Sequence, residues 1–442
     1  MGSYAECWLG SFYVGSTKND VDPRLMQLVR AGDKVAVRGD RSAIPIQMHR
    51  WCDDLPEGEE VSVVFYRAPA VTIRERLELK GYTLELATAA LVANLQAEAV
   101  RAKNWSECER GEIFLPLVAT LENATVAAWF SALREIHDKD LQSSRQKHAA
   151  DNSLLGYMLS HDWLGSGPDP FVGIRLALEV CEPDAELIYD ITDLVRTEAS
   201  AEDEEDYVAY VDGLMSSSYA SSAKTIILTE GRTDSRFISE SLKLLYPHLA
   251  EYFSFMDFEN ARVSGGAGNL ANLVKAFAGA GIVNKTIAIF DNDTAGDAAM
   301  LTLRSVTLPD SIRVLRLPDS EFLLTYPTIG PSGATPMNVN GRAASIELYL
   351  GADVLRDENG ELLPVQWTGY EPALQKYQGE VLFKDRIRER FDSRLDACLR
   401  DPDRVKLTDW SGIRQILQML FSAFHDSDGK EILAGIAEWM DL

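Results

Sequence analysis

Two short acidic motifs carry residue types that could bind a divalent metal ion. The first, EGRTD, spans residues 230–234, and the second, DNDTAG, spans residues 291–296. Asp291 and Asp293 lie two residues apart, so in an extended chain their side chains point to the same side. Carboxylates that converge repel one another unless a cation lies between them, and hard oxygen ligands of this kind suit Mg²⁺ or Mn²⁺. With Glu230, these aspartates predict a metal site.

The elements that must position these acids follow from the hydrophobic pattern. From residue 224 onward, apolar runs that suit buried strands alternate with helical spacings, and the expected strands span 225–229, 253–258, 286–290 and 312–317. Apolar strands separated by helices predict a parallel sheet covered on both faces. Each motif directly follows a strand, and ligands of open parallel sheets bind just beyond the carboxyl ends of the strands. We therefore expect both motifs at one sheet edge.

The same acids also have ordinary structural explanations. Asp234 could be a helix N-cap or a first-turn acid that interacts with the helix dipole, and residues 291–296 could form a plain loop. The occurrence of two acid clusters at the ends of two strands favours the metal site over these alternatives.

Residues 225–317 resemble the Toprim domain, the catalytic module of type IA and type II topoisomerases, primases and OLD-family nucleases. The resemblance rests on a strand followed by Glu-Gly-x-x-Asp and, about 60 residues later, a strand followed by Asp-x-Asp-x-x-Gly. It implies that Glu230, Asp234, Asp291 and Asp293 bind one or two Mg²⁺ or Mn²⁺ ions, and that Glu230, Asp291 and Asp293 are catalytic.

A third stretch, GRAASIELYL at residues 341–350, resembles the Ser-x-Glu element of OLD-type nucleases. In those proteins a Ser and a Glu join the metal site, and a Lys follows on a later helix. The resemblance implies Ser345 and Glu347 as metal-site residues and Lys384 as a catalytic lysine that offsets negative charge in the transition state. Ordinary structural roles stay open for each residue. Ser345 could be a helix N-cap, Glu347 a solvated acid, and Lys384 one of several basic surface residues.

The first half of the chain has a different pattern. Residues 1–70 are rich in β-prone runs, residues 71–165 have helical spacing, and a mixed α+β segment follows. Residues 1–6, 15–20 and 74–83 resemble the HEPN/Toprim-associated N-terminal domain, which precedes a HEPN ribonuclease or a Toprim module in bacterial conflict proteins. The resemblance implies such a domain over residues 1–215.

The expected fold class is α/β, with an α+β N-terminal domain followed by a C-terminal Toprim domain. An acidic run and a Ser-rich run mark residues 198–223 as a linker, because such compositions cannot bury enough surface to fold alone. The Toprim core is expected over 224–325. Residues 326–442 would form its extension, with the Ser-x-Glu element and C-terminal helices.

Charge and missing motifs restrict the function classes. The 442 residues have a net charge of −25, which argues against coating nucleic acid through bulk charge. Residues 1–223 hold 20 Lys+Arg and 37 Asp+Glu, a net of −17, which disfavours nucleic acid in that half. The chain contains no Arg-x(4–6)-His spacing, so a HEPN ribonuclease site is absent, and no GxxxxGK[ST] ATPase motif.

Cysteine usage and hydropathy bear on the compartment. Five scattered cysteines predict neither a zinc ribbon nor a disulfide framework, and no uncharged apolar stretch reaches about 18 residues. We therefore expect a soluble cytoplasmic protein that does not associate with membranes.

The sequence thus predicts a metal-dependent endonuclease that hydrolyses phosphodiester bonds, and the resemblances imply an effector of anti-phage defence. Its expected partners are a nucleic acid substrate, DNA or RNA, a regulatory protein or phage trigger, and further copies of the chain. A non-catalytic Toprim scaffold that binds nucleic acid or a partner protein is the main alternative. Nucleotidyl transfer of the primase kind is a third.

Overall fold

The computed structural model describes residues 2–56, 58–108, 111–141, 153–160, 169–197, 207–211, 224–256 and 264–440. The chain forms two compact units, an N-terminal unit (Met1–Ser217 with Phe424–Leu442) and a C-terminal unit (Ser218–Ala423). Apart from residues 207–211, the expected linker at 198–223 lies outside the described residues.

All five cysteines are free thiols. Within the described residues, no single helix is long and apolar enough to cross a membrane. Two consecutive helical segments, Gly111–Glu122 and Val126–Asp138, reach the required length and apolar composition only when taken together, and the chain bends by 104° between them.

The N-terminal unit contains a five-stranded antiparallel sheet with the strand order β2-β1-β5-β4-β3. Its strands are β1 (Tyr4–Leu9), β2 (Phe12–Lys18), β3 (Lys34–Gly39), β4 (Val61–Pro69) and β5 (Glu186–Asp190). Side chains on opposite faces of β4 enter different cores: Phe65 lies in a small core with Met48, whereas Tyr66 lies in the main helical core. Both faces of the sheet are therefore covered, and the β-rich start that the sequence predicts is confirmed.

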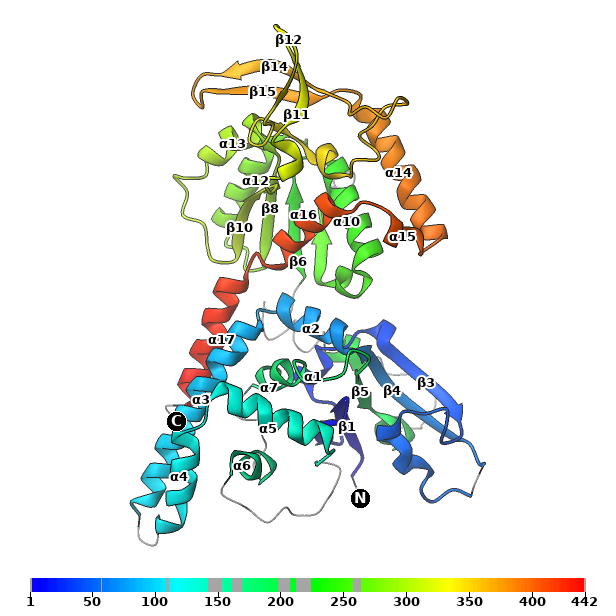
Figure 1. Cartoon of the computed structure of the whole chain (residues 1–442), viewed down its shortest axis with the longest axis vertical. Helices are drawn as coiled ribbons and strands as arrows, with labels where there is room; N and C mark the ends of the chain where they lie inside the picture. Colours follow the sequence, from blue (N-terminus) through cyan, green and yellow to red (C-terminus); the bar gives the residue numbers. More distant parts are fainter. Residues whose placement is uncertain are drawn as a thin grey trace. The chain divides into compact units, whose positions relative to one another are not determined.

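Helices supply the rest of the N-terminal unit (Figure 1). The α-helices are α1 (Pro23–Met26), α2 (Ala70–Leu79), α3 (Leu84–Ser106), α4 (Leu115–Glu122), α5 (Val126–Asp138), α6 (Leu154–Ser160), α7 (Pro170–Ala177) and α8 (Thr192–Thr197). The 3-10 helices are η1 (Ala31–Asp33), η2 (Ile46–Cys52) and η3 (Gly111–Phe114). The central helix α3 buries Ala87, Leu91 and Leu95 in the main core.

The last helix of the chain, α17 (His425–Met440), belongs to the N-terminal unit. Ile436 is 3% exposed and lies in the same core as α3. A Cβ atom added to Gly81 would lie 2.5 Å from the Cβ of Asp428, so α17 approaches the loop before α3 closely. The sequence assigns this helix to the C-terminal extension at 326–442. The structure instead places it in the N-terminal unit, because Ile436 is buried in that core and Ile432 packs against it.

Truncation of Ile436 tests this assignment of α17. Ile436→Ala is expected to destabilise the N-terminal unit by about 3 kcal/mol, because it removes buried methyl groups and leaves a cavity. Hydrogen exchange should then become faster in α3 and leave the C-terminal unit unchanged. Leu433→Ala on the same helix is the control, since Leu433 is 37% exposed. Faster exchange only in the C-terminal unit would contradict the assignment.

The C-terminal unit is built on a four-stranded parallel sheet with the order β10-β8-β6-β7. The strands are β6 (Thr225–Thr229), β7 (Phe253–Phe255), β8 (Thr286–Phe290) and β10 (Ile312–Arg316). The predicted parallel sheet is therefore confirmed. The strand expected over 253–258 ends earlier, and its residues 257–258 lie outside the described part of the chain.

Helices cover this sheet, as Figure 1 shows. They are α10 (Arg232–Leu245), η6 (Pro247–Tyr252), α12 (Ala267–Gly279) and α13 (Thr294–Leu301). Leu270 and Val274 of α12 pack with Leu228 of β6 and Phe290 of β8, because alternate residues of the buried strands point to this face. Helix α10 contacts β6 and, in turn, α14 (Lys384–Arg400) and α16 (Ser411–Phe421).

The extension adds a second sheet, with the strand order β12-β11-β14-β15. Its strands are β11 (Tyr326–Gly330), β12 (Gly333–Met337), β14 (Val365–Glu371) and β15 (Lys376–Val381). A short strand, β9 (Asn292–Asp293), pairs with β13 (Ala343–Ala344). The short helices of this region are η7 (Glu321–Leu323), η8 (Ile346–Tyr349) and α15 (Arg404–Leu407). Strand β13 thereby brings the Ser-x-Glu segment to the end of the parallel sheet.

Candidate functional site

Glu230 and Asp291 lie side by side because the strands that precede them are paired. Thr229 of β6 is in register with Ile289 of β8. The backbone N–H of Asp291 donates a hydrogen bond of 2.9 Å to Glu230 Oε1. The structure thus brings together the first acid of each motif at one edge of the sheet.

Asp293 begins helix α13. Its Oδ1 accepts the backbone N–H of Gly296 at 2.7 Å, and its Oδ2 accepts the Gln378 side-chain amide of β15 at 3.1 Å. Asp293 is therefore an N-cap as well as a member of the acidic cluster. Asp234 lies in the first turn of α10, whose N-cap is Gly231.

Glycine is required where the two motifs approach each other. A Cβ atom on Gly296 would lie 2.4 Å from the Asp291 carbonyl oxygen and 3.3 Å from Glu230 Oε1. Gly266, the N-cap residue of α12, also touches this edge: with φ +107°, it donates its N–H to the Glu230 carbonyl at 2.6 Å. Both contacts hold the backbone of the motifs in place.

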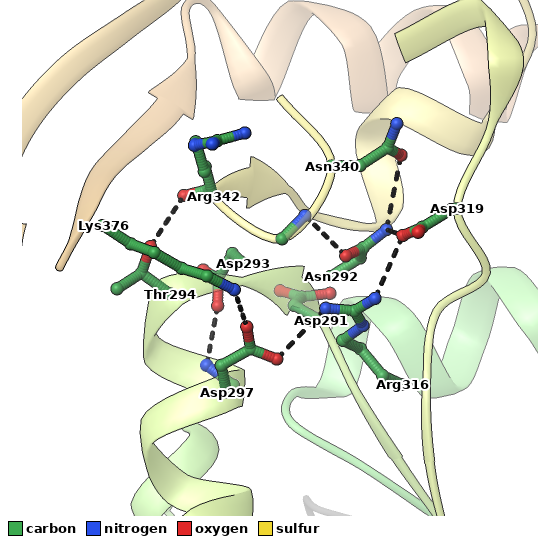
Figure 2. A network of polar contacts seen from close by, with 12 residues as sticks. Asp291, Asn292, Asp293, Thr294, Asp297, Arg316, Asp319, Asn340, Arg342 and Lys376 are labelled. Carbon is green, nitrogen blue, oxygen red and sulfur yellow. Dashed lines mark hydrogen bonds and ion pairs between the residues drawn. The ribbon is translucent and has the colours of Figure 1, made fainter. Parts of the chain in front are cut away.

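Asn292, between the two aspartates, is fully buried and forms the centre of a polar network (Figure 2). Its Oδ1 accepts the Gly341 N–H at 2.7 Å, and its Nδ2 donates to Asp319 at 3.0 Å and to the Tyr349 hydroxyl at 3.2 Å. The network fixes the backbone between Asp291 and Asp293. Its partners come from three later segments of the chain.

A neighbouring acid, Asp297, is neutralised by two cations that sequence reasoning did not single out. Lys376 Nζ lies 2.5 Å from one oxygen of Asp297, and Arg316 Nη1 lies 3.2 Å from the other, as Figure 2 shows. Asp297 is therefore a structural ion-pair partner of these side chains.

Ser345 and Glu347 lie at η8, and both are buried. The Ser345 hydroxyl donates to Glu347 Oε2 at 2.6 Å. Arg388 of α14 donates to Glu347 Oε1 through Nε at 2.9 Å and Nη2 at 2.6 Å. Sequence reasoning missed Arg388, although its position one turn after Lys384 on a basic helix is a usable signal.

Lys384 is the first residue of α14, and its ammonium lies 3.7 Å from Glu380. Its positive charge lowers the pKa of Glu230, Asp234 and Glu347, which places it within electrostatic range of both acids of the first motif and of Glu347. The lysine expected from the Ser-x-Glu resemblance is therefore beside the acidic cluster.

The acids of the two motifs interact strongly with one another. Burial, together with the charges of Asp293 and Asp234, raises the pKa of Glu230 to about 7, against the opposing effects of the Asp291 backbone hydrogen bond and the charge of Lys384. Burial also raises the pKa of Asp234 to about 7, helped by the charge of Glu347. The pKa of Asp291 is raised well above its ordinary value by burial and by Asp234 and Glu230. The ionised cluster is thus destabilised by its own repulsion.

Glu347 behaves differently. Burial opposes its ionisation, but Lys384, the Ser345 hydroxyl and Arg388 outweigh burial, so its pKa is lowered. Among the described residues, Glu347 is the one carboxylate of the cluster that forms a direct ion pair, and its partner is Arg388.

The donor set fits a hard divalent cation, since carboxylate oxygens are the ligands that Mg²⁺ and Mn²⁺ prefer. As whole residues, Glu230, Asp234 and Asp291 are intermediate in exposure rather than fully buried. Within the described residues, no three His, Cys, Asp or Glu side chains are grouped so that they could hold a metal ion as placed. Binding an ion at three carboxylates therefore requires at least one of these side chains to turn.

The raised pKa of Glu230 predicts a specific pH dependence of stability. The folded state holds a proton on Glu230 up to a pH of about 7, whereas the unfolded chain releases it near pH 4. Stability therefore falls as pH rises from about 4 to 7, and stays reduced above that range.

Glu230→Gln removes this titration. In metal-free buffer its melting temperature should exceed that of the unmodified chain by an amount that grows between about pH 5 and pH 8, equivalent to roughly 2 kcal/mol at the upper end. The exposed Glu251→Gln is the matched control. A difference that is constant with pH, or that shrinks as pH rises, would contradict the assignment of the shift to Glu230.

Comparison with known protein families identifies the first half of the chain. Residues 1–212 match the family described as HEPN/Toprim N-terminal domain 1. The N-terminal unit therefore contains a HEPN/Toprim N-terminal domain, as the resemblance in the sequence implies, and such a domain points to a nuclease-related family. No curated protein and no solved structure matches the chain.

Proposed function

We propose that this chain is a divalent-metal-dependent nuclease that hydrolyses phosphodiester bonds at a Toprim-type acidic site. The supporting observation is that Glu230, Asp291 and Asp293 from two separate motifs lie together at the end of the parallel sheet. Burial, together with repulsion between the acids, raises the pKa of Glu230 and of Asp291. A divalent cation would relieve this repulsion.

Each residue of the site has a distinct role in this proposal. Glu230, Asp291 and Asp293 would hold Mg²⁺ or Mn²⁺, with Asp234 beside them. The bound ion would activate a water molecule and stabilise the leaving oxygen of an in-line displacement. Lys384 would offset negative charge that develops on the phosphate. Ser345 and Glu347 would complete the polar wall of the site.

The N-terminal domain would regulate this activity. Its net charge of −17 over residues 1–223 repels a polyanion, which suits restraint of the nuclease or detection of a trigger better than substrate capture. By resemblance to conflict proteins, we place the chain in anti-phage defence in the bacterial cytoplasm. Its partners would be a nucleic acid substrate, a protein or phage trigger and further copies of the chain.

A non-catalytic scaffold that binds nucleic acid or a partner protein is the second candidate. The observation in its favour is that the described carboxylates are not grouped to hold an ion as placed. A scaffold has no need of a tight divalent site, whereas a nuclease of this kind requires one.

One assay separates the two candidates. The purified full chain is incubated with Mg²⁺ or Mn²⁺, or with EDTA, against plasmid, single-stranded DNA, total RNA and tRNA. The nuclease proposal expects ion-dependent cleavage of at least one polymer and a calorimetric signal for ion binding. If all polymers stay intact and no ion binds, the scaffold is favoured and the nuclease proposal fails.

A further inference from the structure

The two sides of the acidic cluster differ in how their charge is balanced. On one side, Glu347 is 1% exposed and both of its oxygens are occupied, one by Arg388 and the other by Ser345. An arginine beside a buried carboxylate is a permanent cation, because the guanidinium does not deprotonate at ordinary pH. Glu347 therefore already has the positive charge and the hydrogen bonds that ionisation in the interior demands.

On the other side, the acids receive only neutral donors. Glu230 accepts a backbone N–H, and Asp293 accepts a backbone N–H and the Gln378 amide. The Asp291 carboxylate has no hydrogen-bond donor in the described part of the chain, and Figure 2 draws none. Of the nearby cations, Lys376 and Arg316 are paired with Asp297 instead, and the ammonium of Lys384 is paired with Glu380.

We infer that Arg388 supplies the positive charge that a second metal ion would otherwise supply, so that each chain binds one divalent ion. This inference rests on the proposed nuclease function. The ion is held by Glu230, Asp291 and Asp293, none of which forms an ion pair with a described Lys or Arg side chain, although the charge of Lys384 acts on Glu230 at longer range. A second ion at Glu347 would have to displace Arg388 and Ser345, and would then lie beside the guanidinium, which repels it.

Arg388 is a positioning residue in this scheme. It fixes the Glu347 carboxylate through two donors on one oxygen, and its charge lowers the pKa of both Asp234 and Glu347. Lys384, one turn earlier on α14, acts on the same two acids and also on Glu230. Arg388 is thus ion-paired with Glu347, whereas Glu230, Asp291 and Asp293 have no ion-pair partner among the described residues.

The number of ions bound is the measurement that tests this inference. Calorimetric titration of the full chain with Mn²⁺ is expected to give one ion per chain, and the electron paramagnetic resonance spectrum at saturation should show isolated Mn²⁺ without spin coupling. Arg388→Met should raise the stoichiometry to two ions, because Glu347 loses the cation that contacts it directly. Arg388→Lys should restore one ion, and the neighbouring Arg386→Met should leave one.

Several outcomes would overturn the inference. Two ions, or a spin-coupled pair, in the unmodified chain would reject it and leave the nuclease proposal standing. No ion in the unmodified chain would reject both. If Arg388→Met does not fold, the unmodified chain and Arg388→Lys still decide the question through their stoichiometry and spectra. A single ion in folded Arg388→Met would also reject the role of Arg388.

Discussion

Asp291→Asn is expected to lower the rate of ion-dependent phosphodiester cleavage by about 1000-fold while it raises the stability of the metal-free protein. The loss of rate follows because a neutral amide binds a divalent ion poorly. The negative charge of the Asp291 carboxylate is then no longer present to hold the ion against the phosphate. The gain in stability follows because Asp291 is destabilised by burial and by Asp234 and Glu230. An amide of the same shape removes that repulsion.

The opposite signs of these two effects identify a functional carboxylate. A residue that serves folding alone would lose stability when it is replaced, whereas strain is retained at sites where function requires it. Cleavage rates at saturating Mn²⁺ and melting temperatures in EDTA are the two measurements. Asp310→Asn changes an exposed aspartate of the same unit and should alter neither. Full activity in Asp291→Asn would eliminate the proposed function.

Asn292→Ala is expected to reduce cleavage by about 100-fold and to destabilise the C-terminal unit by about 3 kcal/mol. The loss of stability arises mainly because the buried Gly341 N–H loses its acceptor, whereas the exposed Asp319 carboxylate keeps its bond to Arg316. The loss of rate arises because Asp291 and Asp293 flank this residue, and small displacements of catalytic groups have large kinetic effects.

Rates and thermal unfolding of Asn292→Ala are compared with those of Asn359→Ala, an exposed asparagine in a turn of the same unit. The control should change the stability by no more than about 0.5 kcal/mol. An Asn292→Ala variant that is destabilised but fully active would show that the network supports the fold without positioning the aspartates. A variant with unchanged stability would show that the hydrogen bonds contribute little.

Much of the architecture could be predicted from local patterns. The strands at 225–229 and 286–290 have the predicted bounds, because a short apolar run between turn residues allows few alternatives. The placement of Glu230 beside Asp291 followed from the rule that neighbouring parallel strands end at the same sheet edge. The strand near 253 was predicted too long, since the apolar run does not reveal where pairing stops.

The sequence by itself determined the N-terminal domain family, the parallel sheet and the acids at its edge, since each depends on residues close together in the chain. The tertiary structure alone decided that Arg388 rather than another basic residue pairs with Glu347, 41 residues away. It also decided that Asn292 binds Gly341 and Asp319, and that the last helix packs in the N-terminal unit. Many charged and amphipathic residues are equivalent in sequence, and only the packing of distant segments selects which of them meet.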